Sequence, residues 1–411
     1  MSVEFNPSDP AIVADPYAIL QQLQDDDPVH WSDALNGWVV TRYDDVRIAL
    51  NDPRLSADRI TPFLDHLPAD ERAALAHVGA MLGRWAVFVD PPLHTRLRAL
   101  MNKAFTSSAL AALRPRIAAI VEDLLDAYVE SDNPDFIAGF AYPLPATVIA
   151  GMVGVPDSDL DLFKSWSDDL ATFVGSAQAT PDKRERAERS AAEMTDYFGS
   201  IIAERRRHPV ADQTIIDHMI AAREGDDALS EAELVANAVL LLFAGHETTT
   251  NLFGNGLLAL LRHPDQLAIL AADPTLATGA VEEILRYDGP IGTITRVGLE
   301  DVVLHGRTIK AGERVFSMIH AANRDPRRFE DPHRFDITRK DNRHIVFGYG
   351  IHFCLGAPLA RMEGEIGLPA LIDKLRDIEL LDADPPWHDS LVLRGVKSLP
   401  IAFRASRPTL A

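Results

Sequence analysis

The chain has 411 residues, 47% of them hydrophobic and 25% charged, which is ordinary for a soluble globular protein and excludes low-complexity disorder or a fibrous repeat. At this length we expect two or three domains or one large fold. The 40 Lys and Arg residues against 61 Asp and Glu residues give a formal net charge of −21, which argues against nucleic acid and acidic membrane surfaces as main partners.

Helical periodicity dominates the chain. Apolar residues recur at three- and four-residue spacing over Pro16 to Gln24, Leu93 to Lys103, Ser108 to Glu130, Ser158 to Val174, Lys183 to Arg207, Leu276 to Arg286 and Leu359 to Leu375. Strand-like runs are few and short: Gly37 to Thr41, Thr295 to Leu304, Arg314 to Met318 and Ile378 to Leu381. The sequence shows no internal repeat and no linker rich in Gly or Ser. We therefore predict a mainly α fold with a small β region, of the α+β class, in a single domain over residues 1–411.

The sequence also indicates where the protein works. Met1 to Leu20 carries acids and prolines and lacks an apolar core, so we expect no signal peptide. The apolar stretch Leu234 to Gly245 is too short to span a bilayer. The single cysteine, Cys354, excludes an internal disulfide and any metal site built from several thiolates. We expect a cytoplasmic monomer.

The longest helix is predicted from Ser230 to Arg262. Ser230 with Glu233 three residues later forms a capping-box pattern, and Pro264 ends the helix. The stretch Ala238 to Ala244 is apolar on every side, which predicts that this helix passes through the centre of the protein.

The middle of this helix, Ala244 to Thr249, carries residues that are unusual for a buried helix. Gly costs about 1 kcal/mol relative to Ala, Thr can bond back to a carbonyl four residues earlier, and a buried Glu is expensive unless it is paired. One interpretation is a kink with a solvated acid at its edge. The other is a widened helix turn beside a reaction site, where the Thr248 hydroxyl and the Glu247 carboxyl manage protons.

Cys354 lies in the glycine-rich segment Phe347 to Gly356, directly before a predicted helix. Gly348, Gly350 and Gly356 permit close backbone approach and positive φ. Backbone N–H groups at a helix N-terminus favour an anion, so we expect them to lower the pKa of the Cys354 thiol. A buried, inert cysteine is the alternative. One thiolate cannot hold a zinc ion, but it can be the single axial ligand of a haem iron.

Two further patterns have ordinary alternatives. Glu283 and Arg286 lie three residues apart on one predicted helix, where a surface ion pair would contribute only about 0.2–0.5 kcal/mol. His94 and Arg98 lie four residues apart and are either solvated bases or two cations that converge on paired carboxylates, such as haem propionates. The segment Ala322 to His352 has little periodicity, and an irregular segment of that length in a compact domain is typical of a functional loop.

Taken together, these segments resemble the bacterial cytochrome P450 enzymes, and the resemblance covers nearly the whole chain. Phe347 to Gly356 is similar to the haem-binding loop of that family in every fixed position. Ala244 to Thr249 is similar to its oxygen-activation motif, and Glu283 with Arg286 to its Glu-x-x-Arg pair. The resemblance implies a cytochrome P450-like fold, in which haem b lies between the long central helix and the Cys-containing helix.

The resemblance also implies roles for individual residues. Cys354 would be the thiolate ligand to iron. Pro332 to Phe335 resembles the family's meander motif, so Arg334 would join Glu283 and Arg286 in a buried charge network on the haem side. The other implied haem-binding residues are Phe347, Gly348, Ala244, His94, Arg98, Arg296 and His352.

The implied activity is a monooxygenase that inserts one oxygen atom from O2 into a small hydrophobic molecule, by hydroxylation or epoxidation. Thr248 would support oxygen activation with a hydrogen bond, and Glu247 would relay protons from solvent. A lid would form from Phe63 to Phe88, and Leu391 to Leu393 would add to the pocket wall. The implied substrate pocket consists of Leu240, Phe243, Ala244, Pro290, Ile291, Thr293, Trp85 and Leu82.

Electrons would come from outside, since no flavin or nicotinamide motif is visible. The resemblance implies a small iron–sulfur ferredoxin and its reductase as donors. Four cations on segments near the thiolate side either offer an acidic ferredoxin a basic patch or are scattered surface charge. They are Arg96, Lys103, Arg343 and Arg361.

Three alternative functions stay open at this point. The first is a haem-thiolate enzyme that uses peroxide directly, which the pair Glu247 and Thr248 argues against. The second is a haem-based sensor of gas or ligand without turnover, and the third is a helical carrier of hydrophobic molecules without haem. The sequence does not name the substrate, because terpenoids, steroids, fatty acids, aromatics and macrolides all suit an apolar wall.

Overall fold

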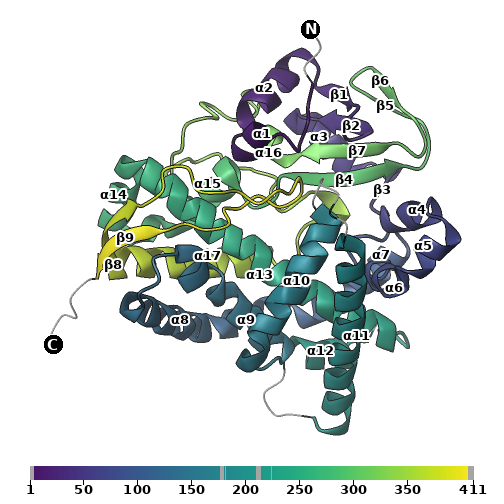
Figure 1. The fold of residues 1–411 in the computed structure, drawn as a ribbon, viewed down its shortest axis with the longest axis horizontal. Coiled ribbons are helices and arrows are strands. Elements are labelled where there is room, and N and C mark those ends of the chain that lie inside the picture. The colour runs from purple at the N-terminus through teal and green to yellow at the C-terminus, as the bar shows by residue number, and fades with distance from the viewer. Residues whose placement is uncertain (1–3, 176–179, 181, 210–213, 224, 406–411) are drawn as a thin grey trace.

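The computed structural model describes residues 4–175, 180, 182–209, 214–223 and 225–405. Helices make up most of the molecule, and most of the strands gather on one side of it (Figure 1). The α-helices are α1 (Pro10–Ala14), α2 (Tyr17–Asp26), α3 (Tyr43–Asn51), α4 (Ile60–Asp65), α5 (Ala69–Ala73), α6 (Ala76–Leu82), α7 (Leu93–Ala104), α8 (Ser107–Glu130), α9 (Pro143–Val153), α10 (Leu160–Gly175), α11 (Lys183–Arg207), α12 (Ile215–Ala221), α13 (Glu231–Arg262), α14 (Pro264–Ala272), α15 (Ala277–Asp288), α16 (Ile319–Ala322) and α17 (Ala357–Lys374). Short π or 3₁₀ turns are η1 (Ile137–Ala141), η2 (Asp157–Asp159), η3 (Pro274–Leu276) and η4 (Gly350–His352).

The main sheet joins residues from both ends of the chain. Its five strands have the order β1-β2-β7-β4-β3, in which β2 and β7 run parallel and the other neighbours run antiparallel. Two small two-stranded sheets pair β5 with β6 and β8 with β9. The strands are β1 (Val29–Ser32), β2 (Gly37–Val40), β3 (Leu55–Ser56), β4 (Thr293–Gly298), β5 (Val302–Leu304), β6 (Arg307–Ile309), β7 (Arg314–Met318), β8 (Leu375–Leu380) and β9 (Ile401–Ala405).

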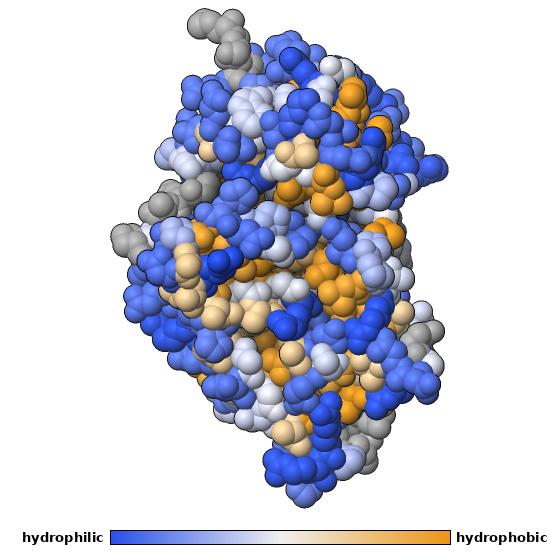
Figure 2. Space-filling model, turned by 90° about the vertical axis from the view of Figure 1, so that its right-hand side faces the viewer, coloured by the Kyte–Doolittle hydropathy of each residue, from blue (hydrophilic) through white to orange (hydrophobic). Residues whose placement is uncertain are grey.

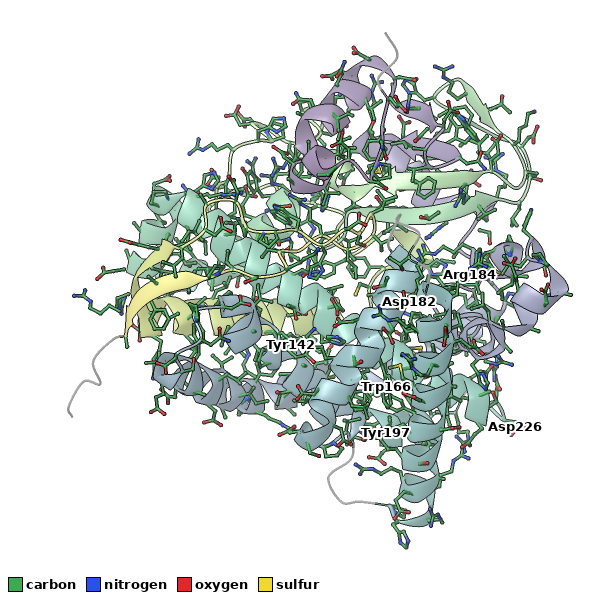
Figure 3. The ribbon with its side chains drawn as sticks, in the orientation of Figure 1. Tyr142, Trp166, Asp182, Arg184, Tyr197 and Asp226 are labelled. Atoms are coloured by element: carbon green, nitrogen blue, oxygen red, sulfur yellow. The ribbon has the colours of Figure 1, made fainter. Side chains whose placement is uncertain are left out.

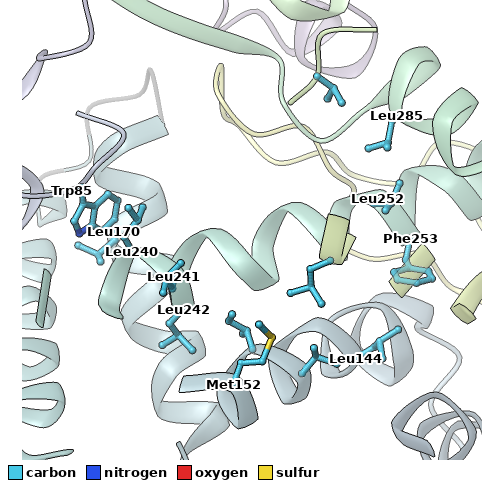
Figure 4. Packing of buried hydrophobic residues seen from close by; sticks show 14 of the residues in the cluster. Trp85, Leu144, Met152, Leu170, Leu240, Leu241, Leu242, Leu252, Phe253 and Leu285 are labelled. Carbon is cyan, nitrogen blue, oxygen red and sulfur yellow. The ribbon is translucent and has the colours of Figure 1, made fainter. Parts of the chain in front are cut away.

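Helix α13 is the central element of the core. Its predicted capping box is confirmed: the Ser230 hydroxyl accepts from the Glu233 N–H at 3.3 Å, and Glu233 accepts from the Ser230 N–H at 2.8 Å. Hydrophobic side chains from neighbouring elements surround α13 along its length (Figure 4). Trp85 lies near Leu240 toward one end, and Leu285 lies near Leu252 toward the other (Figure 4).

Helices α10 and α11 form an outer pair that covers one side of α13. Aromatic rings hold the pair together: the rings of Phe163 and Tyr197 are 5.1 Å apart, and those of Trp166 and Tyr197 are 5.8 Å apart (Figure 3). The Trp166 indole N–H also donates to Glu193 at 2.6 Å, which satisfies the polar atom of this buried side chain. This pair positions the C-terminal end of α10 beside the cavity described below.

The predicted fold class is confirmed, with local differences. The segment Thr295 to Leu304, predicted as one run, forms two strands, β4 and β5, that belong to different sheets. The segment Ala322 to His352 is irregular as predicted, apart from the end of α16 and the short turn η4. Helices α3 and α9 were not predicted. Within the described residues, no helix combines the length and apolar character that a bilayer crossing requires.

Candidate active site

A cavity lies between α13, the connection from α15 to β4, and the segment that ends in Cys354. On the face of the molecule where α4 and α5 lie, hydrophobic residues gather around a hollow (Figure 2). The prediction for Leu82 is wrong: this side chain ends α6 within the core and is fully buried, and Trp85, three residues later, reaches the cavity instead. The other predicted pocket residues line the cavity, namely Trp85, Leu240, Phe243, Ala244, Pro290, Ile291 and Thr293, as do the unpredicted Phe88, Ala171 and Val174.

The central helix presents a hydroxyl to this cavity. The α-helix is continuous through Ala244 to Thr249, so the widened turn predicted there does not form. The Thr248 hydroxyl instead donates to the Ala244 carbonyl oxygen at 3.0 Å, which satisfies it without opening the helix. Gly245 has a packing role, because a Cβ there would lie 2.6 Å from the Ile149 side chain of α9.

Glu247 lies at the cavity beside Thr248, with nitrogen bases around it. One of its carboxylate oxygens is 3.5 Å from Nε2 of His246. Burial alone would raise the pKa of Glu247, but His246, His388 and Lys164 oppose it and hold the pKa below its usual value. An ionised carboxylate with basic neighbours, next to a hydroxyl, can pass protons between the surroundings and the cavity.

Cys354 lines the cavity from a tight turn. The residues Gly348 and Gly350 have φ values of 75° and 71°, in the left-handed region that favours glycine. The turn closes with a hydrogen bond of 2.9 Å from the Cys354 N–H to the Phe347 carbonyl oxygen. Gly356 has an ordinary φ of −82°, and a Cβ there would lie in ordinary contact with the cysteine sulfur at 3.9 Å, so neither predicted reason for glycine applies at this position.

The backbone N–H groups expected near the Cys354 thiol are present, but they do not lower its pKa below the usual value. Burial raises the pKa of Cys354, and the N–H groups of Gly356 and Ala357, with Arg98 and Arg361, oppose this rise without cancelling it. The predicted lowering of the pKa is therefore wrong for the thiol by itself, because desolvation of the charged form wins. The N–H groups are nevertheless in place to stabilise a thiolate, and a coordinated cation removes the remaining penalty.

Basic residues collect at one end of the cavity. The rings of His94 and His352 lie 4.1 Å apart, and the buried Nδ1 of His94 has no hydrogen-bond partner among the described residues. The Arg98 guanidinium donates to the Phe353 carbonyl oxygen at 2.7 Å. Arg296 is only 5% exposed, and burial lowers its pKa to about 10. All four predicted basic residues therefore line the same cavity.

Arg59 adds a cation that the sequence did not indicate. Within the described residues, no carboxylate lies within ion-pair distance of Arg59, Arg98 or Arg296. Desolvated cations and an orphaned ring nitrogen fit a ligand that carries carboxylates. A thiol in a preformed turn fits a metal, and the apolar wall fits a large hydrophobic ring. Haem b combines these three features, so the residues present fit it.

The charge network behind the cavity differs from the prediction in one member. Glu283 and Arg286 are fully buried and pair at 2.7 Å, and the second arginine is Arg339, whose Nε lies 3.2 Å from Glu283. The assignment of Arg334 is wrong: its side chain is 64% exposed, and only its carbonyl oxygen takes part, accepting from Arg286 at 3.0 Å. The Arg334 side chain is exposed because the loop turns at this point, and a 2.9 Å hydrogen bond from the Asp336 N–H to Glu283 holds the turn.

Sequence reasoning also missed Glu363 on α17. This side chain is 1% exposed, lines the cavity, and has a buried carboxyl oxygen without a hydrogen-bond partner among the described residues. Burial raises the pKa of Glu363 well above its usual range, because desolvation penalises the charged carboxylate. No local pattern marks Glu363, because a single acid within a helical segment is also what an exposed position shows.

The predicted basic patch does not form as an uncompensated surface, because the acid-rich chain neutralises most of its members. Each of the three arginines lies within 3.4 Å of a carboxylate, and Lys103 donates to the carbonyl oxygen of Arg223. The ion pairs are Arg96 with Asp227 and Glu233, Arg343 with Asp341, and Arg361 with Glu282.

Comparisons with known proteins agree with this geometry. The family model described as Cytochrome P450 matches residues 159–273 and 271–389. The chain is 43% identical over 372 residues to Cytochrome P450 107B1 of Saccharopolyspora erythraea, covering 89% of each chain, and 38% identical over 394 residues to 6-deoxyerythronolide B hydroxylase of the same organism, covering 94% of each. Its fold is similar to P450BioI in complex with hexadec-9Z-enoic acid ligated acyl carrier protein, with a TM-score of 0.89, 34% identity, and coverage of 96% of this chain and 99% of that chain. The chain therefore belongs to the cytochrome P450 family, monooxygenases that bind haem b through a cysteine thiolate.

Proposed function

We propose that this enzyme inserts one oxygen atom from O2 into a small hydrophobic organic molecule, by hydroxylation or epoxidation. The observation that carries the proposal is an apolar cavity in which Thr248 and Glu247 face the same space as Cys354. Two relatives support it: one is named a hydroxylase, and the P450BioI structure includes a fatty acid carried on a protein.

In this proposal, residues around the cavity bind haem in distinct ways. Cys354 holds the iron through its sulfur, as the only cysteine of the chain. When bound, haem supplies the chemistry that activates O2 and oxidises the substrate. Ala244, Phe347 and Gly348 line the cavity and would contact the ring. The propionates are held by His94, Arg98, Arg296 and His352.

Thr248 and Glu247 donate and transfer protons in this site. The Thr248 hydroxyl, which now donates to the Ala244 carbonyl, can turn and donate into the cavity instead. Glu247 receives protons through its basic neighbours and passes them toward Thr248. The apolar wall around Leu240 and Phe243 orients the substrate and keeps bulk water away from the reaction.

We assign electron delivery to a ferredoxin and its reductase that dock near Cys354. The support is the surface of the Cys-containing loop, where Ile351 is 55% exposed and Phe353 is 44% exposed, next to the thiol. Exposed apolar side chains beside the thiol offer contact area to a protein partner. Arg343, 82% exposed, adds a positive charge that suits an acidic carrier even with Asp341 beside it.

Residues 1–411 are proposed to act as one catalytic domain. The main sheet supports this proposal, because β2 near the start of the chain pairs with β1 on one side and, on the other, with β7, almost 280 residues later. The cytoplasmic location and the monomeric state stay predictions from the sequence.

One experiment separates this function from its alternatives. The haem-loaded protein is supplied with a surrogate ferredoxin, its reductase, NADPH and isotopically labelled O2, and is screened against ligands that shift its haem from low to high spin. The proposal expects a product that contains one labelled oxygen atom. A haem-based sensor would bind ligands without product, a peroxide-dependent enzyme would form product only with added peroxide, and a haem-free carrier would show no Soret absorption.

A further inference from the structure

Two guanidinium groups from segments that are distant in sequence line the same cavity and interact electrostatically. Arg59 stands at the N-terminus of α4, and Arg296 lies in the middle of β4. Both line the cavity, and within the described residues neither has a carboxylate in ion-pair distance. Among those residues, the charged group that acts most strongly on Arg59 is Arg296 itself, a like charge.

This juxtaposition is costly unless an anion is bound. Burial lowers the pKa of Arg59 to about 10, and the positive charge of Arg296 contributes in the same direction. Burial also lowers the pKa of Arg296 to about 10, against a favourable interaction with Asp90. Desolvated like charges are stabilised when a carboxylate accepts hydrogen bonds from both guanidinium groups.

Arg59 is held where the cationic end of the cavity meets the apolar wall. Its guanidinium lies over the Phe88 ring, 4.4 Å from the centroid. Phe88 stacks on Trp85 at 5.6 Å, and Trp85 contacts Phe243 of α13 at 5.3 Å. Arg59 is therefore fixed by ring contacts and leaves its N–H donors free for a ligand, because it donates to no described residue.

Asp90 does not take the place of that ligand. Its carboxylate accepts hydrogen bonds from the Ser56 hydroxyl and, at 2.9 Å, from the Ala57 N–H. These bonds hold it to the β3 segment and leave Arg59 and Arg296 without an ion-pair partner among the described residues.

We propose that Arg59 joins Arg296 in binding one carboxylate inside the cavity, either a propionate of haem or the carboxylate of a substrate. Three arginines, Arg59, Arg98 and Arg296, line this end of the cavity, and the one acid nearby, Asp90, is already held by Ser56 and Ala57. Two propionates supply the negative charge that these guanidinium groups lack, so the haem is the favoured source. The substrate alternative rests on the proposed function, whereas the propionate alternative rests only on the family.

The test compares Arg59→Gln with Arg59→Lys, which keeps the charge, and with the control Arg404→Gln. Arg404 on β9 is 74% exposed, pairs with Asp377 at 2.6 Å and is not among the cavity-lining residues. Haem transfer from each holoprotein to excess apomyoglobin is followed by absorbance. For a propionate, Arg59→Gln releases haem about tenfold faster, Arg59→Lys restores most of the difference, and Arg404→Gln matches the parent. Should Arg59→Gln fail to retain haem during purification, Arg59→Met and Arg59→Lys are compared in the same way.

The second arm identifies a substrate carboxylate. Dodecanoic acid and its methyl ester are titrated into the same proteins, and the spin-state shift of the haem is measured. For a substrate carboxylate, Arg59→Gln weakens binding of the acid about tenfold, leaves the ester unchanged, and leaves haem release unchanged. The proposal is overturned if Arg59→Gln alters neither the haem release rate nor the ratio of acid to ester affinity. The measurement of haem release needs no substrate, so a wrong substrate class does not change its result.

Discussion

Glu283 accepts hydrogen bonds from both Nε and Nη2 of Arg286, at 2.8 and 2.7 Å, and neither side chain is exposed to solvent. The remaining donors of Arg286 reach the carbonyl oxygens of Asn323 at 3.1 Å, Pro332 at 2.8 Å and Arg334 at 3.0 Å. This one pair therefore fastens the long irregular segment 323–349 onto α15. That segment leads directly into the Cys-containing loop, so the pair supports the cavity from behind.

Removing one partner of this pair should prevent formation of the haem-loaded protein. Glu283→Ala leaves the Arg286 guanidinium buried without its carboxylate, which costs on the order of 3–5 kcal/mol. The haem-to-protein ratio after purification, together with the free energy of unfolding in urea, measures the effect. A purified variant with normal haem content would refute this account of the pair.

Arg339 and Arg334 offer a matched comparison. Arg339→Leu removes a cation that is 10% exposed and lies 3.2 Å from Glu283, so we expect a loss of at least about 2 kcal/mol in unfolding free energy and a lower haem content. Arg334→Leu changes a side chain that is 64% exposed and should stay within about 0.5 kcal/mol of the parent. Equal losses in the two variants, or a larger loss for Arg334→Leu, would show that the network is assigned wrongly.

Thr248→Ala should separate electron consumption from product formation. The variant keeps the apolar wall, so ligand-induced spin-state shifts should persist, while loss of the hydroxyl should reduce coupling about tenfold and divert electrons to hydrogen peroxide. Thr248→Ser keeps the hydroxyl and should retain most of the coupling. The measurement is the ratio of product and peroxide to NADPH consumed. Full coupling in Thr248→Ala would exclude the proposed role.

Glu282 should make the fold sensitive to acid. Arg361 and His344 bond to this carboxylate at 2.6 and 3.2 Å; burial alone would raise the pKa of Glu282, but these partners lower it to about 2. Because the pKa is lower in the folded state than in the unfolded state, the contribution is full above the ordinary value of 4.5 and is lost as the pH falls from 4.5 toward 2.

The variant Glu282→Gln measures that contribution. Its unfolding free energy should change with pH less than that of the parent over the same interval, by on the order of 2 kcal/mol after allowance for solvent screening. Urea unfolding at a pH above 4.5 and at one near the lower end of the interval gives the comparison. Identical pH dependence of the two proteins would contradict the assignment.

Much of the fold could be predicted from local patterns, and the failures have physical causes. Helix α13 was predictable because its capping box and Pro264 mark both ends, and its apolar middle marks its central position. Helix α9 was not, because it is apolar on nearly every side and begins with Pro143, so no periodicity shows. Strand β3 consists of Leu55 and Ser56 alone and exists because β4 pairs with it, which no local pattern encodes.

The residues of the candidate site also fall into those that the local sequence predicts and those that it does not. Positions fixed by a local backbone pattern, such as Cys354 in its glycine-framed turn, could be placed from the sequence. Positions that depend on tertiary structure could not be placed. Arg334 was predicted instead of Arg339 because the turn that exposes one and buries the other depends on hydrogen bonds that the local sequence does not encode. Arg59 and Glu363 belong to no motif, and only their burial in a shared cavity reveals them.

The central claim is that the sulfur of Cys354 binds the iron of haem b. The most direct measurement is the absorption spectrum of the purified protein after reduction and addition of carbon monoxide. Thiolate ligation predicts a Soret band displaced strongly to the red of that given by histidine-ligated haem proteins. A Soret band at the position typical of histidine ligation in freshly prepared, folded protein would contradict the claim.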